Sequence, residues 1–289
     1  MANWSATSIF FAVLLTGSVF SPACVECANI LFFVGMTTYS HRVSMWPLVS
    51  SLAQRGHKIT FVSAHPPKSL ANPNVTEVNP KALVTVAEGF HNSNLLEMRL
   101  SGDDGTGLWK EFMELTVSAY ELLGKDQQFL QWFRSSDFDL VVADALFSDF
   151  ALGLAHRWNA QVAIVCTTNP YTFMSDDYGI PVESSWLPDM QIHYIEEEDM
   201  SLLQRTYNTL RPIYWQYLRH FISFPRMEKI LREDLGMVDM PGLSELHKNV
   251  SLVLINSHYS EEYGRALPPF VIPVACMHCF QSKEKTPKV

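Results

Sequence analysis

The sequence predicts an α/β fold, a doubly wound and mostly parallel sheet with helices on both faces. Two apolar runs, 29–34 and 138–145, have the composition of strands that are buried on both faces. A helical pattern and then another apolar run follow each of them, which gives two strand–helix–strand units. Such units cross over with a right-handed connection and therefore place their strands in one parallel sheet.

The first unit ends at residue 63. Its helix, expected at 41–56, has apolar residues about three positions apart and stops at Gly56, since glycine readily adopts the left-handed conformation at a helix end. Those apolar residues are Val43, Trp46, Val49 and Leu52. Pro47 falls near the first helical turn, where proline is tolerated, and the second strand is expected at 57–63.

The other elements follow in order along the chain. They are expected to be a strand at 82–87, one or two helices at 108–133, a strand at 138–145, a helix at 149–159, a strand at 160–168, two helical stretches within 198–236, and strands at 250–257 and 269–275. Three prolines interrupt residues 169–190, which are therefore expected to form an irregular loop.

Composition limits the class of protein. The chain has 289 residues, 47% of them hydrophobic, enough for one large or two modest domains with a buried core. Its formal net charge of −9 argues against nucleic-acid binding, because a phosphate-binding surface needs a basic face. A dinucleotide site is not expected, since Gly35 stands alone where G-x-G-x-x-G would be needed.

Residues 1–27 are expected to be a signal peptide. The apolar stretch 8–20 has the length of a signal-peptide core, and small residues precede Ala28. A signal anchor or a buried strand is the alternative. Cleavage would leave a mature chain without a membrane span in the lumen of the endoplasmic reticulum, where sequons at Asn74 and Asn249 would be N-glycosylation sites.

His41 and Asp144 are the candidate catalytic residues. His41 follows the first strand near a helix N-terminus, whose partial positive charge favours the neutral imidazole that a general base needs. Asp144 ends a buried strand, and the carboxyl ends of parallel strands share one edge of the sheet. A carboxylate there would fix the tautomer of the imidazole. Alternatively, His41 only packs in a turn and Asp144 only caps the next helix.

Three segments together resemble the N-terminal half of animal UDP-glycosyltransferases, insect or other arthropod members most closely. They are ANILFFVGMTTYSHRVSMWPLVSSLAQRGHKITFVS, FDLVVADALFSDFALGLAHRW and NVSLVLINSHYSEEYGRALPPFVIPVACMHC. They occur in the family's order and spacing. The resemblance implies that residues 28–280 form the Rossmann-like, acceptor-binding domain of a glycosyltransferase of the GT-B type.

The resemblance also implies roles for single residues. His41 would take the proton of an acceptor hydroxyl as that oxygen attacks a UDP-sugar, Asp144 would support the charged imidazole, and the transfer would invert the sugar without a metal or cofactor. The acceptor, a small lipophilic alcohol or phenol, would contact residues that could equally be ordinary core. These residues are Tyr39, Phe90, Phe173 and Met174.

The sequence also departs from that family. The donor-binding second domain, with its signature rich in Trp, Gln and His, has no counterpart, and residues 281–289 form a polar tail where that domain would begin. We therefore expect weak or absent turnover from this chain alone. The alternative is a non-catalytic chain that binds lipophilic ligands or forms a homo- or hetero-oligomer with full-length family members.

The segment Cys276-Met-His-Cys279 has the spacing of redox and metal-binding motifs. One such pair supplies only half of a zinc site, so no metal site is expected. Together with Cys166, these are the cysteines that signal cleavage would leave, too few for a disulfide scaffold.

Overall fold

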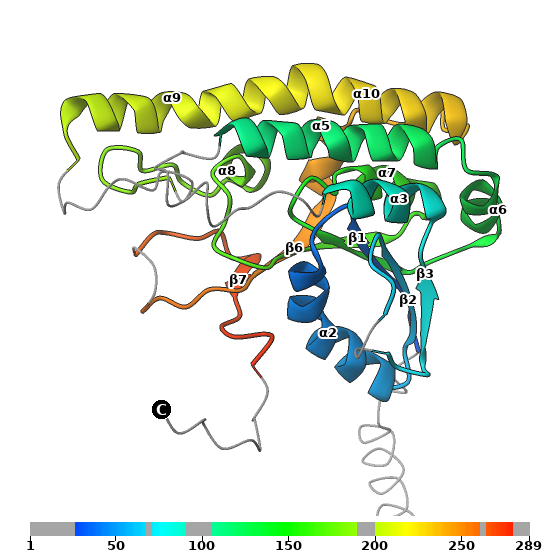
Figure 1. The fold of residues 1–289 in the computed structure, drawn as a ribbon. Coiled ribbons are helices and arrows are strands. Elements are labelled where there is room, and N and C mark those ends of the chain that lie inside the picture. Colours follow the sequence, from blue (N-terminus) through cyan, green and yellow to red (C-terminus); the bar gives the residue numbers. More distant parts are fainter. Residues whose placement is uncertain (1–26, 68–70, 91–105, 190–199, 261–263, 280–289) are drawn as a thin grey trace, which may run out of the picture.

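The computed structural model describes residues 27–67, 71–90, 106–189, 200–260 and 264–279. Within them, seven strands form one parallel sheet in the order β3-β2-β1-β4-β5-β6-β7 (Figure 1). The strands are β1 Asn29–Gly35, β2 Lys58–Ser63, β3 Val75–Val78, β4 Leu140–Asp144, β5 Gln161–Cys166, β6 Val250–Ile255 and β7 Val271–Pro273. The predicted doubly wound α/β class is confirmed.

Helices cover both faces of the sheet. They are α2 Tyr39–Gln54, α3 Lys81–Phe90, α5 Thr106–Leu123, α6 Gln127–Ser135, α7 Phe150–Trp158, α8 Met174–Tyr178, α9 Leu202–Leu218, α10 Phe224–Lys229 and α11 Leu243–Leu246. Figure 1 shows α2 below the sheet and α3, α5, α7, α9 and α10 above it. Of the helices that the structure describes, none is both long enough and apolar enough to cross a bilayer.

Strand β1 shows why a continuous apolar run forms the centre of this sheet. Successive side chains of a strand point to opposite faces. Ile30, Phe32 and Val34 therefore pack in the hydrophobic cluster between the sheet and α2, whereas Leu31 and Phe33 belong to the cluster on the other face. Both faces are buried along Ile30–Val34, which explains why each of these positions is apolar.

The first turn of α2 is anchored by Arg42. Its side chain is fully buried and donates two hydrogen bonds to the carboxylate of Glu77 in β3. The guanidinium carbon also lies 4.5 Å from the ring centre of Trp46 and 4.7 Å from that of Phe61. A charge, two hydrogen bonds and two aromatic faces thus fix the start of this helix against β2 and β3.

The strand expected at 82–87 is wrong, because these residues lie in helix α3. Val75–Val78 forms the edge strand instead and pairs with β2. Leu83 and Ala87 of α3 are buried and lie four positions apart, as expected for a helix with one inward face. The β-branched residues of the segment indicated a strand, but the packing against α5 decided the structure.

The structure differs from the predicted helices in two ways: it contains two additional short helices, and two predicted stretches form one long helix. The loop expected at 169–190 contains the short helix α8, and the connector before β6 contains α11. Of the two stretches expected within 198–236, α9 joins α10 through a π-helical turn at Arg219–Ser223, and a second such turn at Ile230–Asp234 follows α10. Together they run as one long helix across the top of the molecule (Figure 1).

Gly35 ends β1 just before the segment that leads to His41. Its φ angle is +54°, in the left-handed region that side chains disfavour, and a Cβ atom there would lie 2.5 Å from the hydroxyl oxygen of Tyr120. Two independent reasons therefore require glycine at the strand end.

We predict that Gly35→Ala lowers the free energy of unfolding by about 2–4 kcal/mol, because backbone strain and the clash with Tyr120 add. Gly179→Ala is the matched control: φ is +62° there, but nothing lies within 4 Å of the added Cβ, so only the strain of about 1 kcal/mol is expected. Urea denaturation measures both. An equal effect of the two substitutions would contradict the close approach of Tyr120.

Candidate active site

His41 and Asp144, 103 residues apart in the chain, are hydrogen-bonded. His41 is the third residue of α2, Asp144 is the last residue of β4, and the Nδ1–Oδ2 distance is 2.6 Å. Strands β1 and β4 are neighbours, with Phe33 paired to Ala143. The strand order reverses between them, so the pair lies at the switch point where α/β sheets bind ligands. The predicted convergence is confirmed.

The carboxylate of Asp144 is held from several sides. Its Oδ1 accepts a hydrogen bond from the backbone N–H of Leu146 at 2.9 Å, and the Thr37 hydroxyl lies 3.3 Å from Oδ2. The side chain is fully buried, while that of His41 is 9% exposed. The imidazole is thus the more accessible member of the pair.

This arrangement specifies one tautomer of the histidine. An ionised carboxylate only accepts hydrogen bonds, so Nδ1 of His41 donates to Asp144. In the neutral ring the lone pair then belongs to Nε2. A positive charge formed by proton uptake at Nε2 would be stabilised by the carboxylate 2.6 Å from Nδ1.

Thr167 is a member of the site that the sequence analysis missed. Its hydroxyl oxygen lies 3.1 Å from Nδ1 and 3.4 Å from Nε2 of His41. The residue comes directly after β5, the neighbour of β4, and its backbone carbonyl accepts a hydrogen bond from Asn256 at 3.1 Å. Thr167 could have been predicted in the same way as Asp144, because each is a polar residue at the carboxyl end of a buried strand.

Two of the expected acceptor-binding residues, Tyr39 and Phe90, lie at the ends of helices. Tyr39 opens α2 two residues before His41, and its ring meets His65 edge-on with the ring centres 6.1 Å apart. Nε2 of His65 in turn lies 2.7 Å from the carbonyl of Thr37. Phe90 ends α3, but its side chain lies outside the described residues.

The other two are buried in the core. Phe173 is 2% exposed, and its ring stacks on Tyr171 and Phe147 at 5.2 and 5.5 Å, so the core interpretation fits its position. Met174 borders a small cavity that it shares with Asp144. The cavity has space for about one water molecule, so it does not fit an aromatic acceptor.

A buried charge network lies on the other side of this cavity. Arg219 contacts Asp149 at 2.6 Å and Asp177 at 2.5 Å, and Nε2 of His247 lies 2.9 Å from Asp149. Burial alone would raise the pKa of Asp149, but Arg219 and His247 outweigh it and hold this pKa well below its usual range. The network joins α7 and α8 to the long helix.

Both predicted glycosylation sites lie at the surface of the protein. Asn74 and Asn249 are both exposed, so each is accessible, and their glycosylation stays a prediction. Residues 1–26, which contain most of the expected signal peptide, and the tail 281–289 lie outside the described residues.

The fold and the paired residues define a class: an α/β domain of the Rossmann type, with a histidine–carboxylate pair suited to proton abstraction at the edge where such sheets bind ligands. The chain belongs to the family of UDP-glucoronosyl and UDP-glucosyl transferases, whose model matches residues 30–289. The glycosyltransferase family predicted from the sequence is thereby confirmed.

Curated relatives agree with this assignment. UDP-glycosyltransferase UGT5 of Dactylopius coccus is 26% identical over 94% of this chain and 51% of its own length. Human UDP-glucuronosyltransferase 2B15 is 24% identical, over 96% and 53%. Among solved structures, the calicheamicin glycosyltransferase CalG4 has a TM-score of 0.45 and 18% identity, over 87% of this chain and 52% of that one. The chain spans about half the length of the curated relatives it matches.

We predict that Asp149→Asn lowers the free energy of unfolding by about 3–5 kcal/mol at neutral pH, because it leaves Arg219 buried without one of its two carboxylates. Glu245→Gln, which breaks an exposed pair with Lys248, is the control and should change it by less than about 0.5 kcal/mol. Equal effects of the two changes would contradict a network that stabilises the fold.

We predict that the effect of Asp149→Asn on the free energy of unfolding depends on pH. Since the pKa of Asp149 is lowered by folding, its contribution is complete above the unfolded pKa of about 3.9 and is lost as the pH falls below it. The difference in unfolding free energy between wild type and Asp149→Asn should therefore narrow below about pH 4. A difference that stays constant down to pH 2 would contradict the lowered pKa.

We predict that nitrogen NMR finds the neutral His41 ring protonated at Nδ1, because Asp144 faces this atom. In Asp144→Asn the amide can present either end to the ring, so a mixture of tautomers is expected. Asp139→Asn, at the opposite end of β4, is the control and should leave the spectrum of His41 unchanged. Protonation at Nε2 in the wild type would contradict the arrangement.

Proposed function

We propose that this chain provides the base and the acceptor side of an inverting UDP-glycosyltransferase, which moves a hexosyl group from a UDP-sugar to a small lipophilic alcohol or phenol. The observation that supports this most strongly is the 2.6 Å contact between His41 and Asp144 at the switch point of the sheet. Membership of the family supplies the reaction class, with the UDP-sugar as co-substrate rather than a resident cofactor.

The reaction would begin with His41. Its Nε2 takes the proton of the acceptor hydroxyl while that oxygen attacks the anomeric carbon of the sugar. The new carbon–oxygen bond forms on one face as the bond to UDP breaks on the other, and UDP leaves with the electron pair. Asp144 stabilises the imidazolium through Nδ1–H and keeps the ring in the productive tautomer.

Thr167 would act as a positioning residue in this reaction. Its hydroxyl lies beside both ring nitrogens, and Asn256 holds its backbone, so the imidazole contacts a side chain from β4 and another from the end of β5. On the acceptor side, Tyr39 is the aromatic residue nearest to His41 in the chain and is only partly buried.

Several finer expectations stay predictions. They are the location in the lumen, the modification of Asn74 and Asn249, the low turnover of this chain alone and its pairing with full-length family members. For the pairing, one observation is relevant: α9 and the π-helical turn that follows it carry exposed apolar side chains, among them Leu203 in α9 and Phe221 in the turn, 82% and 72% exposed. The non-catalytic alternative is not favoured by any contact described above.

We predict that His41→Ala, introduced into a full-length enzyme containing this chain, lowers kcat by about 10²–10⁴-fold, because the proton acceptor is lost. Asp144→Asn should lower kcat strongly while leaving the fold intact. His57→Ala, at the opposite end of α2, is the control and should retain activity. The assay is transfer from UDP-glucose to a phenol, and full activity in His41→Ala would contradict the proposal.

We further predict that a lipophilic phenol slows hydrogen exchange in 86–95 and 168–180, the segments expected to border the acceptor. The measurement uses the chain itself and needs no UDP-sugar, so it separates acceptor binding from catalysis. No change in either segment at a saturating phenol concentration would contradict the acceptor side of the proposal.

A further inference from the structure

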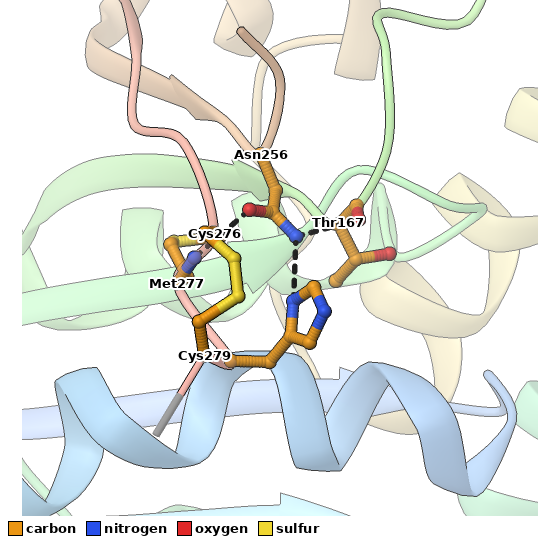
Figure 2. The surroundings of a disulfide bond; sticks show 6 residues. Thr167, Asn256, Cys276, Met277 and Cys279 are labelled. Carbon is orange, nitrogen blue, oxygen red and sulfur yellow. Dashed lines mark hydrogen bonds between the residues drawn. A yellow bond between two sulfur atoms is a disulfide. The ribbon is translucent and has the colours of Figure 1, made fainter. Parts of the chain in front are cut away.

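A disulfide closes the turn that follows β7. Cys276 and Cys279 are bonded, with their Cα atoms 5.1 Å apart, and the backbone N–H of Cys279 donates to the carbonyl of Cys276 at 2.9 Å. Figure 2 shows this turn beside the ends of β5 and β6. The function proposed above does not use it.

Three properties distinguish this bond from a structural disulfide. Both cysteines are exposed, so a thiol in solution can reach either sulfur. Only two residues separate them, and short loops gain least from cross-linking. The φ angle of Cys276 is +58°, a left-handed conformation that a residue with a Cβ disfavours. Reduction would allow this turn to relax.

His278 lies between the two cysteines in the chain and close to them in space. A ring nitrogen of His278 and the two sulfur atoms all lie within 4.8 Å of one another. A nearby imidazole favours the thiolate form of a cysteine, and the thiolate is both the attacking and the leaving group in disulfide exchange. The residue types needed for exchange are therefore present together.

One side chain connects this turn to the candidate active site. Oδ1 of Asn256, just after β6, accepts a hydrogen bond from the N–H of Met277 at 3.0 Å, and Nδ2 lies 3.2 Å from Nδ1 of His278. The same Nδ2 donates to the carbonyl of Thr167 at 3.1 Å, as Figure 2 shows. The hydroxyl of Thr167 lies beside the ring of His41.

We propose that Cys276 and Cys279 form a reversible dithiol–disulfide site, which exchanges with small thiols or a dithiol–disulfide oxidoreductase and whose oxidation state sets the position of Asn256 beside Thr167. A thiolate of the reductant attacks one sulfur, and the other cysteine leaves as a thiolate. A second thiolate of the reductant then resolves the mixed disulfide. Two electrons pass to the protein, the two cysteine thiolates take up two protons, and the reductant becomes a disulfide.

The exchange can be measured on the full chain. The folded protein is equilibrated with a series of reduced and oxidised glutathione mixtures, free thiols are trapped with a maleimide, and peptides are mapped by mass. Cys276 and Cys279 should become labelled together, in one two-electron transition within the series. Cys166 is the internal control: burial raises its pKa to about 12, so it should stay unlabelled.

Two outcomes of that series would overturn the proposal. The pair could stay oxidised in excess reductant, or its cysteines could be labelled independently in every mixture. His278→Gln should slow exchange by about tenfold, whereas His258→Gln, a histidine outside this turn, should not. Binding of one Zn²⁺ per chain by the reduced protein, lost in His278→Gln, would instead assign a metal site and overturn the redox assignment.

The connection to the active site has a readout that does not depend on turnover. The ring resonances of His41 should differ between the oxidised and reduced wild type, because Asn256 and Thr167 lie between the turn and the ring. In the double variant Cys276→Ser, Cys279→Ser, the same redox change should have no effect. Identical His41 spectra in both states of the wild type would overturn the connection.

Discussion

The hydrogen bond between His41 and Asp144 depends on two strands that are distant in sequence and adjacent in space. β1 delivers the histidine through the first turn of α2, and β4 delivers the carboxylate at its last residue. Their pairing lies where the order of the sheet reverses, the position at which α/β sheets bind ligands. Arg42 contributes by fixing the same helical turn to Glu77.

A carboxylate that is buried in the core needs a hydrogen-bond donor or a positive charge as a partner, because burial disfavours its charged form. Asp144 and Asp149 border the same cavity, and each is neutralised or hydrogen-bonded by a different set of groups. Asp144 has His41 and the N–H of Leu146, while Asp149 has Arg219 and His247. Arg219, from the long helix, therefore pairs with Asp149 at the start of α7 and with Asp177 in α8, while Asp144 pairs with His41.

The elements that the sequence predicted well are those whose burial is uniform or strictly periodic. β1 and β4 are buried on both faces, so their continuous apolar runs correctly predicted buried strands. The positions of His41 and Asp144 then follow from the ends of these strands. The prediction of a strand at 82–87 was wrong because the β-branched residues of this segment favour a strand. The four-residue spacing of buried Leu83 and Ala87, which is typical of a helix, was overlooked. Thr167 and Asn256 depend on which strands are neighbours, and strand order cannot be read from a single sequence.

In the proposed reaction, Nε2 of His41 has to receive the proton of the acceptor hydroxyl. A crystal structure of this chain bound to a lipophilic phenol tests this directly. We expect the phenol oxygen within about 2.6–3.2 Å of Nε2, with Nδ1 still facing Asp144. A phenol bound away from the imidazole, or a ring turned so that Nδ1 leaves Asp144, would contradict the account.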